Sequence, residues 1–386
     1  MKRSSPLFVL FFTILIDLLG FGVIVPILGP YSKDVLHAEG WVYGLIFGVY
    51  SLMNFIFAPV LGTLSDRIGR RPVLLVTIVI AMFGHLLFSL SSSLILLFLA
   101  RMIAGIGSAN ISVANAYISD VTPPEGRAKA MGLIGAAFGL GFVFGPPIGG
   151  FIYQHFSFEY IGYLTALLCF LNFILAWFFL PESLKEKNTS TKFNFENILT
   201  GMVEAAKDRR VNIYFLVFFI VVIAFSFMQS TVTLLFKDRY GLNEAQGSYM
   251  FAYVGLLMAI VQGGLIGFFS KRLGENKMLI IGSIMMGIGL ALIPFGPFYL
   301  QFFYFALIAI ANGMLGPALN SLISKNADPQ KLGQTMGANQ SFASLARGIG
   351  PVIAGVLYYV NYTFPYILSG LVMLLCFFVI LRVIKK

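Results

Sequence analysis

Two charged segments of this chain resemble each other and lie 205 positions apart, each between two long apolar stretches. The first segment is GTLSDRIGRRP at residues 62–72, and the second is GFFSKRLGENK at residues 267–277. The same offset aligns residues 118–150 with residues 323–355, where Pro, Met and Gly recur at matching positions. Because one shift aligns both regions, we interpret the chain as a duplication. A fold of two similar halves is therefore expected.

The apolar stretches indicate that this duplicated chain lies in a membrane. Hydrophobic residues make up 58% of the 386 residues, charged residues only 11%, and the mean hydropathy is +0.88. A hydrocarbon core requires about 20 apolar residues per helix, and continuous apolar runs of that length argue against barrel strands. We predict an all-α integral membrane protein of about twelve transmembrane helices in two pseudo-symmetric six-helix bundles. The expected spans are residues 7–30, 41–63, 73–92, 94–118, 128–152, 158–180, 211–236, 246–270, 278–294, 298–322, 335–359 and 363–383.

The distribution of Lys and Arg predicts how the chain crosses the membrane. With both termini in the cytoplasm, 21 of the 26 Lys and Arg residues fall in cytoplasmic segments. The opposite loops contain only Lys33, Lys237 and Arg239. This asymmetry follows the positive-inside rule and predicts an N-in, C-in topology. The net charge of +10 is then explained by topology and anionic membrane lipids, and no nucleic-acid partner is expected.

One long polar segment divides the chain. We expect an N-terminal bundle at residues 1–180, a cytoplasmic linker at 181–210 and a C-terminal bundle at 211–386. Apolar residues at positions 198, 199, 202 and 203 favour a linker helix, either on the membrane surface or fully solvated. The first apolar stretch contains Asp17 and lacks a cleavage site, so we expect it to remain as a helix. Cys169 and Cys376 fall within expected spans and indicate no disulfide framework.

Three motifs carry a resemblance to a known family. The loop pattern Gly62, Asp66, Arg67, Gly69, Arg70 and Arg71 resembles the signature loop of the major facilitator superfamily. The fifth span contains Gly141, Gly145, Pro146, Gly149 and Gly150, similar to the motif associated with antiporters of that superfamily. The first span and Arg101 in the fourth resemble twelve-span drug:proton antiporters, and tetracycline exporters most of all. This resemblance implies proton-coupled export of a small molecule by alternating access in a bacterial inner membrane.

The chain also departs from tetracycline exporters. These exporters carry acidic residues within their third and ninth helices, whereas here the third span has Gly84 and His85, and the ninth has no acid. The resemblance therefore supports the family more strongly than any substrate. His85 is read as a packing residue, with a proton relay as the alternative.

Asp17 is the one carboxylate well inside an apolar span. A charge at that depth is costly, by at least ~2.5 kcal/mol, so the side chain should face a cavity or a partner. Burial favours the protonated form of a carboxyl group and a neighbouring guanidinium favours the ionised form. We therefore predict that Asp17, with Arg101 as its partner, takes up and releases the coupling proton; a static ion pair is the alternative.

Charges at two cytoplasmic loops of the first half predict a gate. Asp66, Arg67, Arg70 and Arg71 border one loop, and Asp120 and Arg127 border the next. Opposite charges there can associate in one conformation and separate in another. The resemblance assigns such a network to the outward-facing state. Simple positive-inside topology is the alternative for Arg70 and Arg71.

The glycines of the fifth span predict close helix packing at the seam between the halves, with residues 348–355 of the eleventh span as their symmetry mate. Arg347 has no basic counterpart in the first half and, if it faces a cavity, favours an anionic or zwitterionic substrate; otherwise it extends toward the membrane surface. The predicted cavity residues are polar or aromatic side chains within spans. They are Phe21, Tyr50, Asn54, Asn110, Phe138, Phe142, Gln229, Tyr253, Gln262, Asn312, Asn320, Asn339, Gln340 and Arg347.

The sequence shows no phosphate-binding loop, no metal-ligand spacing and no nucleophile–base pattern, so we expect neither an enzyme nor a cofactor or metal. We predict a monomeric antiporter for a small amphipathic organic compound, with protons as the coupling ion. Two alternatives stay open. One is a proton-independent or importing transporter for a metabolite or lipid-like anion, and the other is a non-transporting membrane receptor or scaffold.

Overall fold

The computed structural model describes residues 6–38, 40–122, 124–184, 200, 204, 207–327 and 332–384, and all regular elements in these ranges are helices. Eleven helices are long and apolar enough to cross a membrane. A shorter apolar helix, Ala245–Ile260, continues into a π-helical turn and supplies a further span. These helices confirm the prediction of an all-α membrane protein with about twelve spans.

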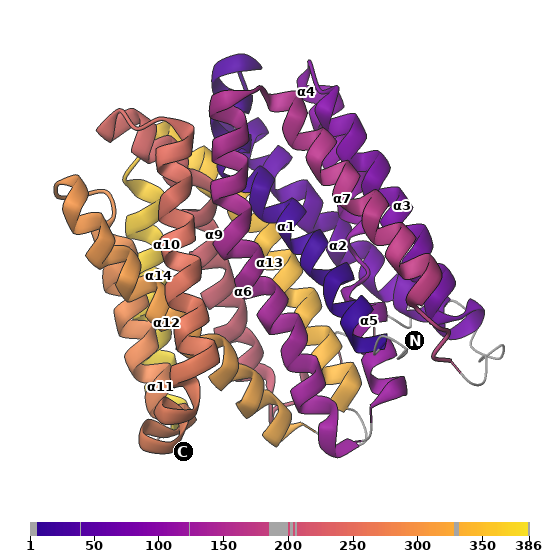
Figure 1. Ribbon diagram of the computed structural model, residues 1–386. Coiled ribbons are helices and arrows are strands. Elements are labelled where there is room, and N and C mark those ends of the chain that lie inside the picture. The colour runs from indigo at the N-terminus through magenta and orange to yellow at the C-terminus, as the bar shows by residue number, and fades with distance from the viewer. Residues whose placement is uncertain are drawn as a thin grey trace.

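The helices follow one another in the predicted order (Figure 1). Those of the first half are α1 (Pro6–Pro30) with the π-helical turn η1 (Tyr31–Val35), α2 (Gly40–Ile68), α3 (Arg70–Ser89), α4 (Leu94–Gly107), α5 (Ile111–Val121), α6 (Pro124–His155) and α7 (Phe158–Phe179). Those of the second half are α9 (Asn212–Tyr240), α10 (Glu244–Ile260) with η2 (Val261–Leu265), α11 (Ile266–Leu292), α12 (Phe298–Asn326), α13 (Leu332–Val360) and α14 (Phe364–Ile384). The expected linker helix lies largely outside the described residues.

The fourth span differs from the continuous helix expected at 94–118. It is broken into α4 and α5 by a turn at residues 108–110, with Ser108 after α4 and Asn110 before α5. Gly105, Gly107, Ser108 and Asn110 follow one another closely here, and all of them have low helix propensity. The break places the Asn110 side chain in the protein interior, where it becomes part of the site described below.

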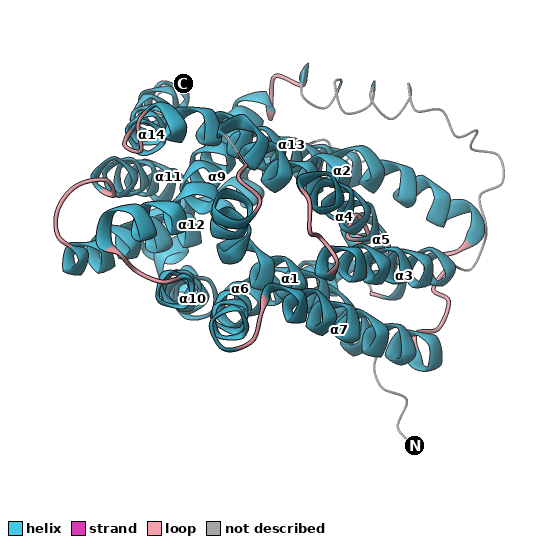
Figure 2. Ribbon diagram, turned by 90° about the horizontal axis from the view of Figure 1, so that it is seen from above, coloured by secondary structure: helices cyan, strands magenta, loops and turns pink. Residues whose placement is uncertain are grey.

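The two halves meet along pairs of helices from opposite halves. Helix α2 packs against α13, α6 packs against α10, and α1 contacts α9. Figure 2 shows α10 beside α6 and α13 beside α2. The start of α1 and the end of α14 lie toward one end of the molecule, the lower end in Figure 1. We call it the terminal end, and the opposite end, where η1 follows α1 and α9 reaches Tyr240, the distal end.

The duplication read from the sequence is visible in the backbone and in the ion pairs. Gly69 and Gly274, at equivalent positions, both have positive φ angles, 114° and 70°. Glycine adopts such angles without steric cost. Gly69 forms the turn between α2 and α3, and Gly274 forms a kink within α11. The ion pair Arg70–Asp120 of the first half is matched by Glu275–Lys325 in the second half. Equivalent positions therefore carry opposite charges.

Candidate functional site

Asp17 lies near the middle of α1 and is 4% exposed. Its Oδ2 accepts a hydrogen bond of 2.5 Å from Nδ2 of Asn110, a fully buried side chain at the break between α4 and α5. The other carboxylate oxygen, Oδ1, is buried and has no hydrogen-bond partner. A buried acid with one free oxygen can exchange a proton or accept a donor from a bound molecule.

Arg101 of α4 is 1% exposed and lies over the ring of Tyr50, with 4.5 Å between Cζ and the ring centroid. This cation–π contact provides part of the compensation for burying the charge. The Nε and Nη1 groups of Arg101 have no hydrogen-bond partner. The predicted Asp17–Arg101 ion pair does not form, because Asp17 is bound to Asn110 and Arg101 is stacked on Tyr50.

Tyr50 of α2 joins several of the predicted cavity residues. Its ring lies 5.3 Å from that of Phe21, which in turn lies 6.4 Å from the ring of Phe142 on α6. Tyr50 also interacts electrostatically with Asp17, Arg101 and Arg347. We call Asp17, Tyr50, Arg101, Asn110 and Arg347 the central cluster. It contains residues of both halves.

The remaining predicted cavity residues divide by environment. The Asn54 amide donates to backbone oxygens of Tyr50 and Gly105 and so joins α2 to α4. Asn339 donates to Asn320 across α13 and α12, at 3.2 Å. Gln229 is buried with Nε2 unpaired. Tyr253 packs against Phe302, and Gln340 is exposed. The partly buried ones are Phe138, Phe142, Gln262, Asn312 and Asn320.

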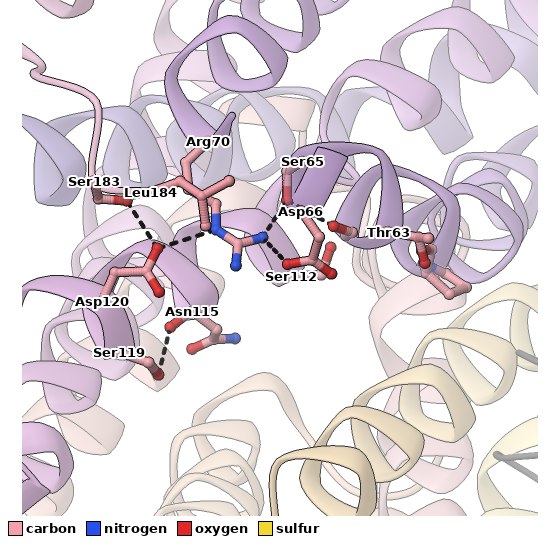
Figure 3. A network of polar contacts seen from close by, with 12 residues as sticks. Thr63, Ser65, Asp66, Arg70, Ser112, Asn115, Ser119, Asp120, Ser183 and Leu184 are labelled. Atoms are coloured by element: carbon pink, nitrogen blue, oxygen red, sulfur yellow. Dashed lines mark hydrogen bonds and ion pairs between the residues drawn. The ribbon is translucent and has the colours of Figure 1, made fainter. Parts of the chain in front are cut away.

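The charged loop at the terminal end forms a network centred on Arg70 (Figure 3). The Arg70 guanidinium contacts Asp66 at 2.6 Å and Asp120 at 3.1 Å, and Nη1 donates to Ser65. The Arg70 side chain is only 8% exposed. Losing both carboxylates would leave a nearly buried charge unpaired, at a cost of about 3–5 kcal/mol.

Glu182, which the sequence reasoning missed, caps this loop. Its carboxylate accepts hydrogen bonds from the backbone N–H groups of Arg70 and Arg71, at 2.9 and 3.2 Å, at the start of α3. A carboxylate at a helix N-terminus accepts hydrogen bonds from backbone N–H groups that lack a partner within the helix, and it interacts favourably with the helix dipole. Arg71 donates to the Trp177 carbonyl oxygen, and Arg67 is exposed. Gly62 lies over Ser112 of α5, whereas the Arg127 side chain lies outside the described residues.

Two ion pairs join the halves at the distal end, and the sequence reasoning missed both. Lys33 contacts Asp238 at 3.0 Å, and Lys237 contacts Asp34 at 2.6 Å. Tyr358 of α13 donates a further hydrogen bond of 2.9 Å to Asp238. A pocket of about 480 Å³ is lined in part by Lys33, Asp238 and Tyr358. Lys33 and Asp238 occupy equivalent positions in the two halves, so their opposite charges could have indicated this ion pair from the sequence.

The glycines of α6 pack mainly within the first half. A Cβ on Gly141 would lie 2.9 Å from the side chain of Leu18, and one on Gly145 would lie 2.8 Å from the Gly22 backbone, both on α1. Gly149 likewise lies against Val23, whereas Gly150 meets Ala245 of α10 across the seam. Pro146 and Pro147 lie inside the helix. The seam prediction therefore holds for Gly150, and the other three motif glycines contact α1 instead.

Glycines also bring α2 and α13 together at the seam. A side chain on Gly44 would overlap the Pro351 backbone, and one on Gly48 would overlap the Gly348 backbone. Small residues of this kind let two helix backbones approach closely. Among the described residues, no group of three or more His, Cys, Asp or Glu side chains is placed to hold a metal ion.

A profile of the Major Facilitator Superfamily matches residues 10–272 and 263–386 of the chain. The chain belongs to the major facilitator superfamily. It is 31% identical to the class C tetracycline resistance protein of Escherichia coli, over 93% of this chain and 91% of that protein. Multidrug resistance protein 2 of Bacillus subtilis (strain 168) is 28% identical, over 97% of this chain and 94% of that protein.

Solved structures agree with this assignment. The human organic anion transporter MFSD10 (TETRAN) superposes with a TM-score of 0.77 at 25% identity, covering 98% of this chain and 100% of that one. A peptide transporter POT variant shares the fold alone, with a TM-score of 0.79 at 15% identity, covering 100% of this chain and 96% of that one. Family and neighbours together confirm a multi-pass membrane transporter of the superfamily, rather than an enzyme.

Proposed function

We propose that this protein is a proton-coupled antiporter that exports a small amphipathic organic compound by alternating access. Its relatives include tetracycline and multidrug resistance proteins, which supports export of a drug-like molecule. The proposal places the protein as a monomer in a bacterial inner membrane, with the terminal end in the cytoplasm. The excess of Lys and Arg at that end supports this orientation.

The observation that carries proton coupling is the environment of Asp17. The side chain is buried, receives one hydrogen bond from a neutral amide and has no cationic partner among the described residues. An intramembrane acid without a counterion is costly to keep charged, so binding and release of a proton at Asp17 accompany the conformational change. Tyr50 and Phe21 lie beside it and offer aromatic surface to an organic substrate.

The ion pairs support a gate at the distal end. The pairs Lys33–Asp238 and Asp34–Lys237 connect the two halves, so the distal end is held closed. At the terminal end, Arg70–Asp120 and Glu275–Lys325 each lie within one half. In the proposed cycle the halves, 1–180 and 211–386, rock about the central cluster. The distal pairs then break as the substrate leaves toward the outside. The Arg70 network is formed here while the distal end is closed, so by itself it does not distinguish the two states.

A second candidate is a transporter for an organic anion that does not use a proton gradient. Two cations, Arg101 and Arg347, lie in the central cluster with one acid, Asp17. The structural similarity to a human organic anion transporter favours the same candidate. The two functions differ in whether a pH gradient drives the substrate uphill.

Reconstitution into liposomes that contain a pH-sensitive dye distinguishes these functions. A panel of cationic, zwitterionic and anionic compounds is added to wild type and to Asp17→Asn under a fixed pH gradient. Antiport predicts substrate-dependent proton movement that Asp17→Asn abolishes, while the variant still folds. Substrate flux without proton movement in the wild type would refute antiport and favour the second candidate.

A further inference from the structure

Two arginines of the central cluster lack a carboxylate partner. Arg101 is 1% exposed with Nε and Nη1 unpaired, and its contact is the face of Tyr50. Arg347 is partly buried, and its hydrogen bond goes to the neutral hydroxyl of Ser344 at 3.2 Å. Neither guanidinium takes part in an ion pair with any described acidic residue. Asp17, the acid of the cluster, is bound by Asn110 instead.

The two arginines lie on helices that pack against α2, one from each half. Arg101 belongs to α4, which packs against α2, and Arg347 belongs to α13, which packs against α2 from the second half. Arg347 shares a helix face with Pro351, four residues on, whose backbone contacts Gly44 of α2. Arg101 stacks on the ring of Tyr50. Gly348, next to Arg347, packs against Gly48 and Leu52 of α2, two residues to either side of Tyr50, and Arg347 interacts electrostatically with that tyrosine. Both arginines therefore lie beside the same turn of α2 at the seam.

Two like charges in the interior of a membrane protein are expensive unless an anion compensates them. No described carboxylate forms an ion pair with either guanidinium. A guanidinium donates charge-assisted hydrogen bonds to carboxylate and phosphate groups, and Nε and Nη1 of Arg101 are buried without a partner. We propose that Arg101 and Arg347 bind the anionic head group of an amphipathic organic carboxylate, which bridges the two halves.

Aromatic side chains next to the arginines fit the apolar body of such a molecule. The rings of Tyr50, Phe21 and Phe142 form a connected row with centroid distances of 5.3 and 6.4 Å. An arylalkyl carboxylate can place its ring on this row and its head group between the guanidiniums. The proposal rests on the proposed transport function, because it names the substrate class of the same site.

Binding of 4-phenylbutyrate to the purified protein in nanodiscs tests this proposal. The uncharged 4-phenylbutanol and the cationic 4-phenylbutyltrimethylammonium share its apolar body and serve as competitors. Wild type should bind radiolabelled 4-phenylbutyrate saturably, and neither competitor should displace it. Arg347→Gln should weaken binding by roughly 10- to 100-fold, the effect of losing a hydrogen bond to a charged group. Arg347→Lys should recover part of the lost affinity, because lysine keeps the positive charge but not the planar set of guanidinium donors.

Arg272→Gln is the matched control, because Arg272 also stacks on an aromatic ring, Phe268 at 4.8 Å, but is exposed on α11. It should leave 4-phenylbutyrate binding unchanged. Unchanged binding in Arg347→Gln, or preferred binding of the cation, would overturn the proposal. If the cationic compound drives proton exchange and Asp17→Asn abolishes it, the anion site is refuted and proton antiport is supported. If 4-phenylbutyrate binding depends on Arg347 but no proton movement accompanies transport, the anion site is supported and proton antiport is refuted.

Discussion

Reversing the charge of Lys33 tests the distal gate. Lys33 and Asp238 are 37% and 42% exposed in their side chains, and Lys237 and Asp34 are 38% and 39% exposed. Half-exposed pairs of this kind contribute roughly 0.2–1 kcal/mol each. Lys33→Asp replaces one attraction by a repulsion of similar size, a change of about 0.4–2 kcal/mol. The population with an open distal end should then rise by roughly 2- to 30-fold.

The opening can be measured as a distance between spin labels at Phe156, where α6 meets α7, and at Tyr299 in the first turn of α12. Both side chains are exposed, at 61% and 71%, and lie at distal ends of opposite halves. The buried Cys169 and Cys376 are first replaced by Ala. Lys33→Asp and Asp238→Lys should each populate a longer distance, and the double exchange should restore the short one. Lys271→Asp at the terminal end is the control and should change nothing.

The double exchange is the decisive variant, because it keeps the ion pair but exchanges the positions of the two charges. Restored closure would require the direct contact between Lys33 and Asp238 that the structure shows. If the single reversals leave the distance distribution unchanged, or if the double exchange stays as open as the singles, the ion pairs do not hold the distal end closed. High salt should weaken the closure in wild type, since it screens exposed charges.

Two further predictions concern stability. Glu182→Gln removes the charged cap of α3, which accepts hydrogen bonds at 2.9 and 3.2 Å. It should destabilise the protein by about 1 kcal/mol, measured as a lower Tm in detergent. Glu204→Gln, which replaces an exposed acid, should leave the Tm unchanged. Gly145→Ala places a Cβ 2.8 Å from the backbone of α1 and should destabilise the protein by about 1–3 kcal/mol. Gly316→Ala, where nothing lies within 4 Å, should leave the Tm equal or higher, and equal loss in both variants would contradict the packing argument.

The sequence predicted most of the fold because its signals are local or repeated. Apolar runs indicate spans whatever the tertiary structure, and the offset of 205 positions relates the two halves. The charged loop is similar, since Asp66 and Arg70 are one helical turn apart and bond as their spacing suggests. Asp120, from the next loop, completes the network at 3.1 Å from Arg70.

The central cluster was harder to predict, because depth in the membrane does not fix the direction of a side chain. Asp17 and Arg101 lie within neighbouring spans of one half, but the break after Gly107 brings Asn110 to Asp17 instead. Arg101 then stacks on Tyr50, an interaction that the spacing of residues along the sequence does not predict. The distal pairs did have a signature, since Lys33 and Asp238 are equivalent positions of opposite charge near the pseudo-symmetry axis.

Proton-driven accumulation and passive exchange, compared in the same liposomes, test the central role of Asp17 most directly. A labelled substrate found in the compound panel is followed first under a pH gradient and then in exchange for unlabelled substrate without a gradient. We expect Asp17→Asn to keep exchange, because folding and the binding site remain, but to lose uphill accumulation. Uphill accumulation that persists in Asp17→Asn would contradict the assignment of Asp17 as the proton carrier.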